Sequence, residues 1–141
     1  MSKTINTKID DGILTFTFTN NQNEIFAFFR LNPTDVNIAA RAEEVSAFFE
    51  KTEETVKNVT SAKEAAKLNE LIQDKINYLL GYEASKDLFR EPITATTVFG
   101  NGQMFANIVL DKVADAIAPE IEKRRKKMQA EVDKYTEKYT K

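Results

Sequence analysis

The strongest periodic pattern of hydrophobic positions lies near the middle of the chain. Its apolar residues recur every three or four positions, the spacing of one helix face, at Leu68, Leu71, Ile72, Ile76, Leu79 and Leu80. The pattern predicts a helix over residues 62–80. Ser61 and Glu64 form an S-x-x-E capping box at its start, and Gly81 suits the left-handed residue that ends a helix. A short second helix over residues 83–89 is expected to follow.

Residues 4–31 show the two-residue alternation that is typical of β-strands. Three runs carry it, with apolar positions at Ile5 and Ile9, then Leu14, Phe16 and Phe18, then Ile25, Ala27 and Phe29. Asp11-Gly12 and the polar residues 20–23 separate the runs and are turn signals. We therefore expect an N-terminal three-stranded antiparallel β-meander with one face covered by helices.

Two further helices are expected on either side of the central one. The Asn-Pro-Thr-Asp sequence at residues 32–35 predicts a helix start, because these residues suit the N-cap and the first turn. That helix should end near Val59. Residues 103–118 predict another helix, which Pro119 should break or kink. Residues from 120 onward predict a polar helix with a thin apolar seam.

The predicted fold class is therefore α+β, with the β-meander followed by a predominantly helical bundle and a charged C-terminal helix. We expect one α+β domain over residues 1–118, with the β-meander at 4–31 and helices at 33–118. Residues 119–141 form the charged C-terminal helix, which either packs on the domain or binds a partner. This segment carries eight Lys and Arg against five Asp and Glu, whereas the rest of the chain carries 12 against 17.

Composition restricts the chemistry of the chain. Its 141 residues are 42% hydrophobic and 30% charged, as expected of one folded domain. There is no Cys, so disulfides, thiol nucleophiles and thiolate zinc sites are excluded. There is no His, which is the usual general base near neutral pH and the commonest metal ligand. We expect no catalytic site, no cofactor and no metal.

Charge and hydropathy indicate the expected cellular location of the protein. Its net charge of −2 gives no overall attraction to nucleic acid or to an anionic membrane. The polar start of the chain lacks the apolar core of a signal peptide, and no apolar run approaches the ~18 residues of a membrane span. We expect a cytoplasmic protein that makes no contact with membranes.

The basic run at residues 123–127 is the sharpest charge feature. We interpret it first as a solvated helix face, second as a site for an acidic protein, and third as a nucleic-acid contact. Acidic residues flank it, and no aromatic residue interrupts it to stack on bases. Two glycine-containing turns, at 10–12 and 100–102, lack the ligand spacing of calcium and phosphate loops.

Apolar residues beyond the needs of a core are candidates for binding a partner. They form three groups: Phe26 and Phe28 on the third predicted strand, the Phe48 and Phe49 pair, and the terminal seam of Met128, Val132, Tyr135 and Tyr139. For each of the two Phe pairs, core packing is the favoured interpretation. The terminal seam is as compatible with packing on its own domain as with holding a partner helix.

Two stretches carry a resemblance to a known family. One is Phe-Arg-Leu-Asn-Pro-Thr-Asp at residues 29–35, which leads into a helix with Arg41. The other is Ile-Asn-Tyr-Leu-Leu-Gly-Tyr-Glu-Ala-Ser-Lys-Asp-Leu-Phe at residues 76–89. With the strand-first order and the charged tail, the chain resembles the tail assembly chaperones of long-tailed phages and prophages of Gram-positive bacteria. The likeness covers most of the length through short, degenerate motifs.

The resemblance implies a non-enzymatic protein of the bacterial host cytoplasm. Such chaperones bind the tape-measure protein, keep its apolar helical segments soluble and recruit tail-tube subunits during tail morphogenesis. The residues alone leave two alternatives open. One is a different protein-interaction module, for example a homo-oligomer formed through the C-terminal helix. The other, favoured less, is a nucleic-acid-binding regulator that uses residues 123–127.

Overall fold

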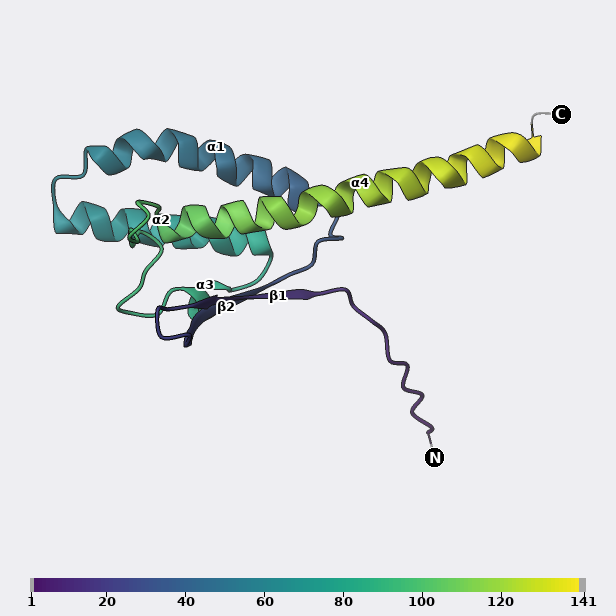
Figure 1. Ribbon diagram of the computed structural model, residues 1–141, viewed down its shortest axis with the longest axis horizontal. Helices are drawn as coiled ribbons and strands as arrows, with labels where there is room; N and C mark the ends of the chain where they lie inside the picture. Colours follow the sequence, from purple (N-terminus) through teal and green to yellow (C-terminus); the bar gives the residue numbers. More distant parts are fainter. Residues whose placement is uncertain (1, 140–141) are drawn as a thin grey trace.

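The computed structural model describes residues 2–139 as an α+β protein with two strands and four helices (Figure 1). In chain order the elements are β1 (Leu14–Thr19), β2 (Ile25–Leu31), α1 (Ile38–Lys57), α2 (Ala62–Leu80), α3 (Ser85–Leu88) and α4 (Phe105–Tyr139). α1 and α2 form an antiparallel helical hairpin, and α4 lies beside both. The β-hairpin and α3 lie on the side of α2 and α4 away from α1 (Figure 1).

The sheet has two strands, so the expected three-stranded β-meander is wrong. Residues 2–13 form no strand, and Ile5 is 90% exposed. Instead, the carboxylates of Asp10 and Asp11 accept hydrogen bonds from the backbone N–H groups of Gly12 and Ile13, each at 3.0 Å. The first residue of β1, Leu14, is already 43% exposed, so the helices bury little of the sheet at this end. A strand outside β1 would therefore have little apolar surface to bury against.

The β1–β2 hairpin follows the predicted alternation. Phe16 pairs with Phe29 and Phe18 with Ala27, so their side chains share the inner face. The expected turn at residues 20–23 is confirmed, with the side-chain oxygen of Asn20 accepting two backbone N–H groups. These local contacts fix which face of the hairpin meets the helices.

The outer edge of β2 is closed by the segment that follows α2. The hydroxyl of Tyr82 accepts a hydrogen bond from the backbone N–H of Arg30 at 2.7 Å. The guanidinium of Arg30 lies 5.3 Å from the centroid of the Tyr82 ring, a cation–π distance. Tyr82 therefore satisfies an edge donor and fixes the hairpin against the end of α2.

The central helix α2 confirms the sequence prediction at both ends. The Ser61 hydroxyl accepts a hydrogen bond from the backbone N–H of Glu64 at 3.2 Å. Gly81 has φ +81° and caps the helix by donating its N–H to the carbonyl of Asn77. The short helix predicted after it is α3.

The start of α1 differs from the prediction, because the helix begins at Ile38 rather than after Asn32. The side-chain oxygen of Asn32 accepts from the backbone N–H of Thr34 at 3.1 Å, and that of Asp35 accepts from Asn37 at 2.9 Å. Two successive side-chain turns therefore replace the expected first helical turn. Asp35 is further held by a 2.7 Å ion pair with Arg41.

α4 continues without interruption through Pro119, where a break or kink was expected. Pro119 cannot donate to the carbonyl of Asp115, but both residues are exposed, so water can hydrate that carbonyl. The apolar face of α4 is buried as far as Ile117, and the residues after it are mostly exposed. The C-terminal half of α4 therefore projects from the body (Figure 1).

The core joins the hairpin to the helices through Phe105, which is fully buried at the start of α4. Its ring centroid lies 5.1 Å from that of Phe18 and 5.3 Å from that of Phe99, both edge-on. The ring of Phe89, after α3, lies 5.6 Å away. Edge-to-face aromatic contacts of this kind fix relative orientation as well as burying area.

Candidate functional site

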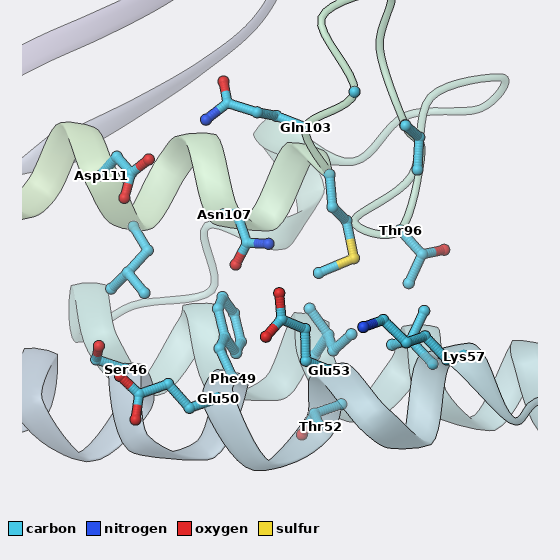
Figure 2. Close-up of a pocket in the computed structure, with 16 residues that line it drawn as sticks. Ser46, Phe49, Glu50, Thr52, Glu53, Lys57, Thr96, Gln103, Asn107 and Asp111 are labelled. Atoms are coloured by element: carbon cyan, nitrogen blue, oxygen red, sulfur yellow. The ribbon is translucent and has the colours of Figure 1, made fainter.

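A groove of about 570 Å³ lies between α1 and α4 (Figure 2). One wall is the second half of α1, from Ser46 to Lys57, and the other is the first two turns of α4. The segment at residues 96–104 closes one end, where Val98 and Met104 form an isolated antiparallel bridge. The groove is open to solvent.

The groove has an apolar interior. Its apolar lining residues come from α1, α2, α4 and the 96–104 segment and are Phe49, Val56, Ile72, Val98, Met104 and Leu110. Figure 2 shows the Phe49 ring and the Asn107 amide in the gap between α1 and α4. Val56 and Val98 are 40% and 64% exposed, so apolar surface here faces solvent. A helix with an apolar stripe is the ligand shape that such a groove accepts.

The charged residues that line the groove are mostly acidic. Glu50 and Glu53 of α1 and Asp111 of α4 contribute three carboxylates, against the single ammonium group of Lys57. Figure 2 shows Glu53 pointing from α1 toward α4, and the Lys57 side chain extending along α1 with its ammonium end on the side of Glu53. The arrangement favours a ligand that is apolar on one side and positively charged at its edges.

The predicted site residues fall in separate places, and among those whose side chains the structure describes only Phe49 lines the groove. Phe48 is half-buried beside it, and the ammonium group of Lys75 lies 5.0 Å from its ring centroid. Phe28 is half-buried on β2, on the face away from Phe29. Phe26 lines a second, smaller hollow of about 470 Å³, where its ring lies 5.8 Å from that of Phe105.

The terminal seam is exposed along the projecting half of α4. Met128 is 69% exposed, Val132 55% and Tyr135 63%. Tyr139 lies in the helix, but its side chain is outside the described part of the structure. Met128, Val132 and Tyr135 are therefore more than half exposed to solvent, and the interpretation of the seam as a partner-binding surface stays a prediction.

The basic run is also on this projecting half. Arg125 donates to the Glu122 carboxylate at 2.6 Å, and the guanidinium holds the pKa of that carboxyl below its usual value. Of the five basic residues at 123–127, Arg124 is half-buried and the others are exposed. The run is thus largely solvent-facing, which all three interpretations require.

Sequence reasoning missed the acidic lining of the groove. Glu50, Glu53 and Asp111 lie on two helices that are far apart in the sequence, and no motif joins them. The one available signal was the position of Glu50 and Glu53 beside Phe49 on the same predicted helix. Within residues 2–139 no three acidic side chains lie close enough together to hold a metal ion.

Comparison with known proteins adds no relative: no protein-family model, curated protein or solved structure matches the chain. In the described residues, no helix is both long enough and apolar enough to cross a membrane.

Proposed function

We propose that this protein is a phage tail assembly chaperone that holds an amphipathic helical segment of the tape-measure protein. The observation that carries the proposal is the solvent-open groove between α1 and α4, with its apolar interior and acidic edge. The sequence resemblance at residues 29–35 and 76–89 supports the same function.

The groove suits the task of keeping such segments soluble. A long helical protein awaiting assembly exposes apolar stripes that would otherwise associate with one another. Binding each stripe against Phe49, Val56 and Met104 removes apolar area from water, which gains about 25 cal/mol per Å². The protein would act in the cytoplasm of the bacterial host, recruit tail-tube subunits and carry out no reaction.

The test is co-expression with the tape-measure protein encoded in the same genome. We expect the chaperone to raise the soluble yield of that protein and to co-purify with it. Val56→Asp places a charge on the groove lining and should reduce both effects. Leu71→Asp is the matched control, because Leu71 is similarly exposed on α2 but does not line the groove.

The proposal fails if wild-type protein neither raises the soluble yield nor co-purifies. It also fails if Val56→Asp and Leu71→Asp behave alike while both remain folded by circular dichroism, because the groove would then be irrelevant to binding.

A further inference from the structure

Beyond Ile117, α4 carries features that match the groove. Met128, Val132 and Tyr135 follow one another at spacings of four and three, so they share one face of the helix. The basic run at 123–127 precedes them directly. The segment from residue 120 onward has a net charge of about +3, from eight basic and five acidic residues.

The dimensions of the two surfaces agree. The wall from Ser46 to Lys57 spans eleven residue steps, or about 16 Å at 1.5 Å per residue. The apolar face from Met128 to Tyr135 spans seven steps, or about 10 Å. The seam therefore fits within the groove and leaves room for flanking basic side chains to approach its carboxylates.

The tail cannot reach the groove of its own chain. Asp111 of the groove and Met128 of the seam lie on the same uninterrupted helix. Seventeen residue steps separate them, or about 26 Å along the helix axis, and the tail points away from the body. Folding it back would require breaking α4. A second copy can supply the tail without any such rearrangement.

We propose that the groove accepts the C-terminal segment of α4 from a second copy of this chain. Met128, Val132 and Tyr135 pack against the apolar groove lining, and cations of the 123–127 run face Glu50 and Glu53. If the exchange is reciprocal, it closes a symmetric dimer, and if it is not, it builds a longer assembly.

This contact also has a regulatory consequence, which rests on the proposed function. The tail of the second copy occupies the same groove as the client helix, so the two compete. The dimer protects the apolar lining until a client displaces the tail. The homotypic contact itself follows from the shape and charge of this chain and stands without any client.

The experiment is complementation between two charge variants of the full chain. The groove variant is Glu50→Lys with Glu53→Lys, and the tail variant is Arg125→Glu with Lys127→Glu, two residues that flank the seam on either side of the helix. Mass in solution is measured by light scattering over a range of protein concentrations. We expect wild-type protein to self-associate. The dissociation constant of each variant should be at least about tenfold higher than that of wild type, because like charges then face each other.

Mixing the two variants is the decisive step. The intact tail of the groove variant meets the intact groove of the tail variant, so the mixture should form a heterodimer that neither variant forms alone. Glu43→Lys with Glu54→Lys is the matched control, since it makes the same charge change on exposed α1 positions outside the groove. This control should associate like wild type.

Three outcomes overturn the proposal: a monomeric wild-type protein at all concentrations, a groove variant that associates like wild type, or a mixture without heterodimer. The second outcome would indicate tail-to-tail pairing instead. None of the three outcomes bears on whether the chaperone raises the soluble yield of a client protein. Failure of this proposal and failure of the proposed function are therefore distinguishable.

Discussion

The contact between Phe18 of β1 and Phe105 of α4 joins the hairpin to the helices, and its strength can be measured. The two ring centroids lie 5.1 Å apart and the ring planes are at 89°. Aromatic pairs in this arrangement contribute about 0.5–1.5 kcal/mol beyond their area burial. In a double-mutant cycle of Phe18→Leu and Phe105→Leu, we expect the double variant to lose less stability than the sum of the singles by about this amount.

The single variants should remain folded. Phe105 also contacts the rings of Phe26, Phe89 and Phe99, with centroid distances between 5.3 and 5.8 Å. Truncating a buried Phe to Ala costs about 3–5 kcal/mol. Leucine keeps most of the apolar volume, so about 2–3 kcal/mol is expected for Phe105→Leu, below the ~5–15 kcal/mol of a typical domain.

The assay is urea unfolding followed by far-UV circular dichroism, with the free energy of unfolding extrapolated to water. Phe48→Leu is the control, because the Phe48 ring lies beside Phe49 and Lys75 rather than in the Phe105 cluster. In a Phe48→Leu/Phe105→Leu double variant, the loss of unfolding free energy should equal the sum of the two single losses to within about 0.3–0.5 kcal/mol. A Phe18–Phe105 coupling no larger than this control value would refute the packing of the hairpin on α4.

Three further predictions concern local contacts. The Arg41 guanidinium, which donates to Asp35, holds the pKa of that carboxyl below its usual value, and the N–H of Asn37 adds to the effect. Asp35→Asn should therefore destabilise the protein above about pH 4, with the deficit shrinking as pH falls through the folded-state pKa. Ser61→Ala removes the cap of α2 and should cost about 1 kcal/mol of unfolding free energy. Gly81→Ala forces alanine to φ +81° and should cost about 1–2 kcal/mol.

The same urea titrations test all three. A deficit for Asp35→Asn that stays constant from pH 7 to about pH 3 would contradict the linkage argument. For Ser61 the control is Ser61→Asp, which can cap the helix and should retain most of the stability. For Gly81, the asparagine variant should cost less than the alanine variant, because asparagine tolerates the left-handed region better. The reverse order would contradict the strain argument.

The candidate site shows how far local patterns reach. Phe49 was a partner-binding candidate for which core packing was favoured; it is 8% exposed, belongs to the core and also lines the groove. Its acidic neighbours were not expected, because Asp111 comes from a helix that begins about fifty residues after α1 ends. The groove exists because α1 and α4 lie far enough apart along this part of their length to leave a hollow between them. Periodicity within either helix contains no information about that distance.

The sequence by itself determined the features whose partners are close neighbours in the chain. The Ser61 cap, the left-handed Gly81 and the turn at residues 20–23 each depend on contacts within a few residues, so their side chains and backbone suffice. The hydrophobic faces of β1, α1 and α2 follow in the same way from spacing alone.

The tertiary structure decided the features that depend on distant surfaces. Ile5 and Ile9 alternate like a strand, yet they stay unpaired with the sheet because the helices cover little beyond β1. Pro119 would be expected to end a helix, yet α4 passes through it because Asp115 and Pro119 are open to water. In both cases the free energy of forming the strand or continuing the helix depends on which groups are buried and which are hydrated. That environment is defined only when the whole chain has folded.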